Sequence, residues 1–201
     1  MLEKRAIVLF SGGVLSTTAL KFMINQGYDI VTLTFVTENQ PQEEIFAIEK
    51  ICESFNVKEC VFISLEGANV DSSSNKMLLS LSYAGILAEE YEAQKIVTGI
   101  CMDNNKISDN PIFFDLFEKT LNFCLDNNKI TIMSPLEFLT KKQVLKWGIE
   151  DLGINYKDTV SCLNPKNSNG CRICNKCIER RTLFSELNII DSVSYDTSNL
   201  S

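Results

Sequence analysis

The sequence contains no histidine among its 201 residues. This absence excludes Ser-His-Asp triads, Cys-His dyads and every zinc site that uses imidazole, so thiolates or carboxylates must hold any metal. Glycine and proline are also scarce, with 9 and 4 residues, which excludes a collagen-like or low-complexity chain. The ordinary shares of hydrophobic (45%) and charged (22%) residues instead predict a globular protein with one core.

Basic residues are too few to balance the acidic ones: 19 Lys and Arg stand against 26 Asp and Glu, for a net charge of -7. This excess argues against direct contact with nucleic acid or with an anionic membrane surface. No apolar run approaches the roughly 20 residues that cross a bilayer, and the first ten residues lack a signal-peptide core. We therefore expect a cytoplasmic protein that acts on a small molecule.

Short apolar runs alternate with amphipathic segments along the chain. The alternation predicts an α/β fold with a doubly wound parallel sheet, whose ligands bind at the carboxyl ends of the strands near the switch in strand order. We expect residues 1–155 to form this domain, residues 156–187 to form a metal-binding segment packed on it, and residues 188–201 to be a surface or partly disordered tail. The expected strands cover residues 6–10, 30–36, 60–65, 95–99 and 130–133, and the expected helices cover 16–26, 75–91 and 111–125 and begin at 41 and 140.

A glycine-rich loop follows the first expected strand. Its backbone N–H groups, at the start of a helix, are suited to cradle an anion. The loop matches neither the Walker A pattern nor the dinucleotide GxGxxG pattern, and an ordinary glycine turn is the alternative. The candidate nucleotide-binding residues are Phe10, Ser11, Gly12, Gly13, Ser16, Thr17 and Thr18.

Four cysteines near the C-terminus form the pattern C-x8-C-x2-C-x2-C. They are Cys162, Cys171, Cys174 and Cys177. This spacing predicts a closed tetrahedral zinc site, more often structural than catalytic, with an iron–sulfur cluster as the less favoured occupant. The other cysteines, at positions 52, 60, 101 and 124, are expected to be small buried side chains.

Three lysines follow Thr140, which begins a capping box with Gln143. Lys141, Lys142 and Lys146 suit either a phosphate-binding patch or, as we expect, a solvated helix face.

The loop and the cysteines together resemble the 7-cyano-7-deazaguanine synthase family, the queuosine-pathway branch of the PP-loop ATPases. The loop Ser11-Gly-Gly-Val-Leu15-Ser16 is similar to that family's SGGxDS, and Thr159-Val-Ser-Cys162 begins the most specific shared segment. The resemblance implies a Rossmann-like, adenine nucleotide alpha hydrolase-like fold with ATP held by the loop and by Gly99. It also implies Mg²⁺, structural zinc, a substrate contact from Asn75 and a homodimer.

The same resemblance implies an ATP-dependent C–N ligase. Such enzymes adenylate 7-carboxy-7-deazaguanine and use ammonia to convert its carboxylate into a nitrile. Leu15 replaces the family's acidic residue, residues 36–41 match none of its DYGQRH motif, and its PGRN motif keeps only Asn75. Three functions therefore stay open: this synthase activity, action on another carboxylate or a protein, and a catalytically silent nucleotide-binding zinc scaffold.

Overall fold

A five-stranded parallel sheet forms the centre of the fold, with strand order β3-β2-β1-β4-β5. The computed structural model describes residues 4–37, 42–65, 73–103, 110–125, 129–163 and 170–193. The order reverses between β1 and β4, so the predicted doubly wound α/β fold is confirmed. The strands are β1 (Arg5–Leu9), β2 (Asp29–Val36), β3 (Glu59–Ser64), β4 (Lys95–Val97) and β5 (Thr131–Met133).

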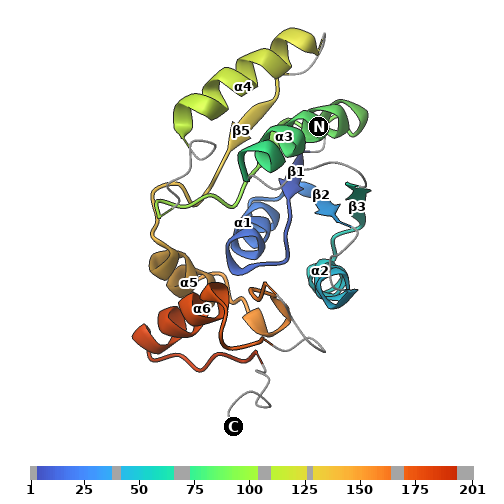
Figure 1. Cartoon of the computed structure of the whole chain (residues 1–201). Helices are drawn as coiled ribbons and strands as arrows, with labels where there is room; N and C mark the ends of the chain where they lie inside the picture. The colour runs from blue at the N-terminus through green and yellow to red at the C-terminus, as the bar shows by residue number, and fades with distance from the viewer. Residues whose placement is uncertain are drawn as a thin grey trace.

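Helices cover both faces of the sheet, as Figure 1 shows. α3 and α4 pack on one face, while α1, α2 and α5 pack on the other and α6 lies against α5. β1 is buried on both sides because Ala6 and Val8 enter one core and Ile7 enters the other. The helices are α1 (Val14–Asn25), α2 (Gln42–Ser54), α3 (Ser73–Glu90), α4 (Pro111–Cys124), α5 (Lys141–Glu150), α6 (Asn175–Glu186) and the short 3-10 helix η2 (Tyr156–Asp158).

α4 covers the outer edge of β5 with polar side chains. The Asn122 side chain donates to the Ile130 carbonyl (2.7 Å) and accepts from its N–H (2.8 Å), and Glu118 accepts from the Ile132 N–H (2.7 Å). These contacts satisfy backbone groups that an edge strand would otherwise leave open to pairing with another chain.

A smaller core joins α5, η2 and α6. Leu145, Ile154, Tyr156 and Phe184 are buried together in it. The Tyr156 hydroxyl lies 2.6 Å from the Thr18 hydroxyl of α1, which ties this core to the main one. Burial raises the pKa of Tyr156 to about 12, against the opposing effect of the Thr18 hydrogen bond, so the phenol stays protonated at neutral pH.

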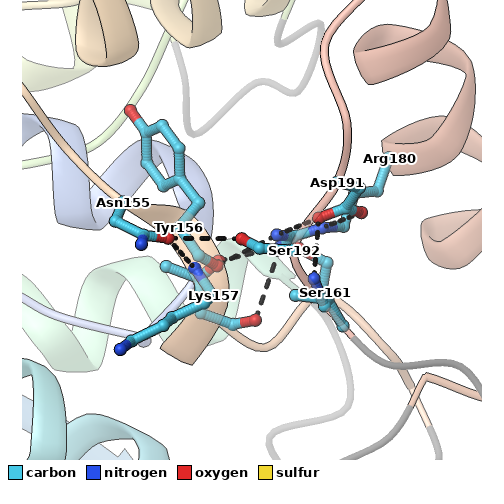
Figure 2. A network of polar contacts seen from close by, with 9 residues as sticks. Asn155, Tyr156, Lys157, Ser161, Arg180, Asp191 and Ser192 are labelled. Atoms are coloured by element: carbon cyan, nitrogen blue, oxygen red, sulfur yellow. Dashed lines mark hydrogen bonds and ion pairs between the residues drawn. The ribbon is translucent and has the colours of Figure 1, made fainter.

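Arg180 of α6 connects this core to the C-terminal segment (Figure 2). Its guanidinium forms a two-point ion pair with Asp191 at 2.8 and 2.9 Å, and the two side chains are 4% and 8% exposed. The remaining N–H groups donate to the Tyr156 carbonyl, to Thr159 and to the Ser161 hydroxyl. A buried guanidinium needs such a complete set of acceptors.

The predictions for two cysteines need correction. Cys124, at the end of α4, is exposed rather than buried, and Cys60 is only half-buried, whereas Cys52 and Cys101 are buried as expected. Of the expected tail, residues 194–201 lie outside the described residues, and Asp191 in its described part supplies the counter-charge of buried Arg180. Across the described ranges, no helix combines the length and apolar character that a membrane span requires.

We predict that Asp191→Asn destabilises the fold by about 3 kcal/mol, because it leaves the Arg180 charge buried without a counter-ion. Asp29→Asn is the matched control, since Asp29 pairs with Arg5 at 2.9 Å where both side chains are partly exposed. The Asp29→Asn substitution should lower the free energy of unfolding by less than about 1 kcal/mol. Urea unfolding of both variants measures the difference, and equal losses would contradict a dominant role for the buried pair.

Candidate nucleotide-binding cleft and metal site

The loop between β1 and α1 has a conformation that requires glycine. Gly12 has a φ of +70°, and a Cβ there would lie 2.8 Å from Ile48 Cγ1. Ser16 Oγ donates to the Gly13 carbonyl (3.2 Å) and lies 3.2 Å from Ser11 Oγ. Gly13 is the N-cap of α1 and makes no side-chain cap hydrogen bond, and the first N–H groups of a helix have no partner within the helix. This arrangement is suited to bind an anion at the start of α1.

Two segments distant in sequence support the loop from behind. The Val160 N–H donates to the Gly12 carbonyl (3.1 Å). Gly99 follows β4 and lies against the first turn of α1, where a Cβ would be 3.0 Å from the Ser16 backbone nitrogen. The end of β4 approaches the loop this closely because position 99 has no side chain.

The predicted nucleotide-binding residues occupy three different environments. Ser11, Gly13 and Ser16 line a first cleft beside the loop. Phe10 belongs to the core and lines a second cleft. Thr17 and Thr18 are buried, and the Thr18 hydroxyl donates to the Val14 carbonyl (2.8 Å) and contacts Tyr156. The structure thus places Thr18 in the scaffold behind the loop rather than at its opening.

The first cleft, of about 320 Å³, lies between the loop and the wall formed by residues 160–163, α5 and α6. Leu15 lines it on the loop side. Three cationic side chains, Lys141, Lys176 and Arg180, line the opposite wall together with Glu179, and Glu44 of α2 also borders the cleft. The prediction of a solvated face was wrong for Lys141, whose side chain is 24% exposed, whereas Lys142 and Lys146 are largely exposed.

Glu179 bridges the two lysines of this wall. One of its carboxylate oxygens accepts from Lys141 Nζ, and the other lies 3.5 Å from Lys176 Nζ. Partial burial by itself would raise the pKa of Glu179 and lower that of Lys141. The contacts between the charged groups outweigh burial, so the pKa of Glu179 is lowered and that of Lys141 is raised. Glu179 and Lys141 are therefore both charged at neutral pH.

The second cleft, of about 520 Å³, opens at the carboxyl ends of β1, β2 and β3. Its walls are mostly apolar, and Lys76, Ser80 and Glu44 are among its polar side chains. Asn75, the predicted substrate contact, is exposed one residue before Lys76 and is not among the lining residues. The two clefts share Ser11, Glu44 and Leu163, so they meet at the loop. The apolar lining comprises Leu9, Phe10, Leu33, Phe35, Leu65, Met77 and Leu163.

The four C-terminal cysteines converge on one point, with all their sulfurs within 4.8 Å of one another. Backbone N–H groups approach three sulfurs: that of Cys171 approaches Cys162 (3.3 Å), that of Cys174 approaches Cys171 (3.4 Å), and that of Cys177 approaches Cys174 (3.4 Å). Burial opposes the thiolate form of Cys174, but hydrogen bonds from the backbone of Leu163 and Cys177 and from the neighbouring cysteine side chains lower its pKa to about 6. Four converging sulfur ligands fit a tetrahedral metal site.

Comparison with known proteins decides the family. The family model described as "Queuosine biosynthesis protein QueC" matches residues 5–76 and 68–188. The chain belongs to the QueC family. A relative in this family, the 7-cyano-7-deazaguanine synthase of Rickettsia massiliae (strain Mtu5), is 28% identical over 228 residues, covering 96% of this chain and 100% of that protein. The identity is low over nearly the full length, so the chain is a divergent QueC member.

Solved structures of lower identity share the fold of this QueC member. NMN synthetase from Francisella tularensis has a TM-score of 0.52 at 16% identity, covering 98% of this chain and 90% of that one. A 4-thiouridine synthetase solved with RNA and bound ATP has a TM-score of 0.54 at 18% identity, covering 91% of this chain and 53% of that one. Family and fold together support an ATP-dependent synthase-type function.

For the metal site, we predict that the purified protein contains about one equivalent of zinc and that Cys174→Ser lowers this content severalfold. Cys124→Ser is the matched control, because Cys124 is exposed and lies outside the cysteine cluster. Elemental analysis of both variants makes the comparison. A protein with iron and sulfide instead of zinc, or with no metal, would contradict the prediction.

For the loop, we predict that Gly99→Ala weakens ATP binding about tenfold, because the new Cβ displaces the first turn of α1. Gly85→Ala is the matched control: its Cβ would lie 2.7 Å from Cδ2 of Leu121, a side chain that can move. Calorimetric titration with ATP should therefore separate the two variants, and unchanged affinity in Gly99→Ala would contradict the assigned role of this contact.

Proposed function

We propose that this chain is an ATP-dependent synthase that activates a carboxylate by adenylation, with 7-carboxy-7-deazaguanine and ammonia as its substrates. The observation that carries the proposal is the meeting of the two clefts at the glycine-rich loop, where Ser11, Glu44 and Leu163 line both. ATP in the first cleft and a carboxylate in the second would present their reacting atoms to each other at this junction. Such positioning is a large part of the catalysis of a two-substrate reaction.

The first cleft supports ATP binding through its charge and its backbone. In this proposal the open N–H groups at the start of α1 and the Ser11 and Ser16 hydroxyls bind phosphate oxygens. Lys141 and Lys176 approach the phosphates from the opposite wall. Fixed donors and cations of this kind stabilise the negative charge that develops as pyrophosphate leaves.

The second cleft supports a planar heterocycle that bears a carboxylate. Phe10, Phe35 and Met77 offer apolar surfaces for the ring. Lys76, in the first turn of α3, is the cation that lines this cleft in the described part of the chain, and it would pair with the carboxylate. It would do so without the arginine of the PGRN motif, which this sequence lacks.

The proposed reaction proceeds in two activations. A carboxylate oxygen forms a bond to the α-phosphorus of ATP, and pyrophosphate leaves. The nitrogen of ammonia attacks the acyl carbon, AMP leaves with that oxygen, and loss of a proton gives the amide. A second ATP adenylates the amide oxygen, and departure of this AMP with loss of the remaining N–H protons gives the nitrile. The two kinds of leaving group, pyrophosphate and AMP, carry negatively charged phosphates that the cations of the first cleft can stabilise.

The proposed role of the metal is structural. A four-thiolate site leaves no open coordination position for water or substrate. Bound zinc would supply folding free energy to residues 156–187, which we assign as a segment packed on the nucleotide-binding domain of residues 1–155. Cys162 lines the first cleft, so the metal site would also stabilise the wall of that cleft.

A second candidate function is a catalytically silent nucleotide-binding scaffold. Leu15 favours it, because a hydrocarbon side chain lines the first cleft where the family's loop carries a carboxylate. The two candidates differ in turnover, not in ATP binding.

Incubation with ATP, ammonium and 7-carboxy-7-deazaguanine tests the proposal. We expect AMP, pyrophosphate and the nitrile, measured by phosphorus NMR and mass spectrometry. Phe35→Ala should raise KM for the carboxylate about tenfold and leave KM for ATP unchanged, and Lys141→Met should do the reverse. ATP binding without carboxylate-dependent AMP release would refute the synthase and favour the scaffold.

A further inference from the structure

We propose that this chain binds the triphosphate of ATP without a divalent cation, and that Lys141 and Lys176 supply the positive charge. This inference rests on the proposed function in one respect, ATP binding in the first cleft. It follows from which side chains line that cleft and from how they are already paired.

The loop side of the cleft does not provide ligands suited to Mg²⁺. This ion prefers octahedral oxygen coordination, which proteins usually supply through one or two carboxylates together with substrate phosphates and water. Leu15 contributes only hydrocarbon. The Ser11 and Ser16 hydroxyls are neutral, lie 3.2 Å apart, and one of them donates to the Gly13 carbonyl.

The carboxylate on the opposite wall is already neutralised. Both oxygens of Glu179 contact lysine ammonium groups, one from Lys141 and one from Lys176. A divalent cation on Glu179 would have to displace these contacts and would then lie beside two ammonium groups, at a large electrostatic cost. Among the described residues, Glu44 of α2 is the other carboxylate that lines the cleft. In that part of the chain, the glycine-rich loop therefore supplies no carboxylate for a protein-held magnesium ion, and the carboxylate of the opposite wall is engaged by lysines.

The same wall is well suited to bind phosphate directly. In the described part of the chain, Lys141, Lys176 and Arg180 are the cations that line the cleft. Arg180 directs its donors to Asp191 and to residues 156–161, which leaves the two lysines as the cations that can reach a ligand. Glu179 holds the Lys141 ammonium group on this wall before the nucleotide arrives, so that lysine loses less side-chain entropy on binding.

The position of Lys141 strengthens its effect. It is the first residue of α5, and its backbone N–H donates to Asp103 at 2.6 Å, which fixes the start of the helix. Its side chain is 24% exposed, so its charge is less screened than that of a fully solvated lysine. Lys176 is more exposed, at 53%, and can follow the ligand.

Calorimetric titration of the zinc-loaded protein with ATP tests the inference. One titration contains excess Mg²⁺. The other omits Mg²⁺, and resin treatment removes residual divalent ions from its buffer. We expect the two dissociation constants to agree within about threefold. Lys141→Met and Lys176→Met should each weaken binding in the magnesium-free buffer about tenfold. Lys142→Met is the matched control, because Lys142 pairs with Glu186 across the same two helices (3.0 Å) and does not line the cleft.

A variant whose ATP binding should depend on Mg²⁺ provides a second test. Leu15→Asp should weaken ATP binding without Mg²⁺, because the new carboxylate repels phosphate, and Mg²⁺ should restore the affinity. Wild-type binding that requires Mg²⁺ would overturn the inference and leave the proposed ATP site intact. If Glu44→Gln then abolished that binding, the cation would be assigned to Glu44. Failure to bind ATP in either buffer would instead refute the proposed function itself.

Discussion

The close approach of three backbone segments around the glycine-rich loop is the constraint on which the rest of the structure depends. Gly12 has a positive φ and lies against Ile48, while Gly99 lies against the first turn of α1. The Val160 N–H bonds to the Gly12 carbonyl from a segment almost 150 residues later in the chain. The sheet, α2 and the C-terminal segment therefore all contact the loop and its helix start.

This dependence explains why so much of the C-terminal part serves the loop. Residues 159–161 contact Gly12 on one side and are held by Arg180 on the other. Asp191 neutralises Arg180, and the cysteine cluster begins at Cys162, directly after this segment. The ion pair and the cysteine cluster thus flank the same short stretch of backbone, which lines the first cleft.

The sequence was sufficient to predict what depends on local patterns. Alternating apolar runs predicted the parallel sheet, and Thr140 with Gln143 forms the expected capping box. The spacing of the cysteines predicted their convergence, because short intervals between ligands constrain the backbone. The Ser-Gly-Gly motif predicted the turn between β1 and α1.

Other features depend on contacts between distant residues and leave no local pattern. Glu179 and Lys176 resemble ordinary charges on a helix surface, and only the packing of α6 against α5 brings them to Lys141. Asp191 looks like one acidic residue in a polar tail until its partner is known to be buried. Thr18 belongs to the loop in sequence, yet the helical rotation of α1 directs it into the core, toward Tyr156. The second cleft is formed by three strands and α3, so no single segment predicts it.

The central claim is that ATP and a carboxylate react with each other where the two clefts meet. The most direct test is a single turnover with 7-carboxy-7-deazaguanine labelled with oxygen-18 in its carboxylate, followed by mass spectrometry of the AMP. Adenylation transfers a carboxylate oxygen to phosphorus, so the account predicts AMP that carries the label. Unlabelled AMP, or ADP as the nucleotide product, would contradict it.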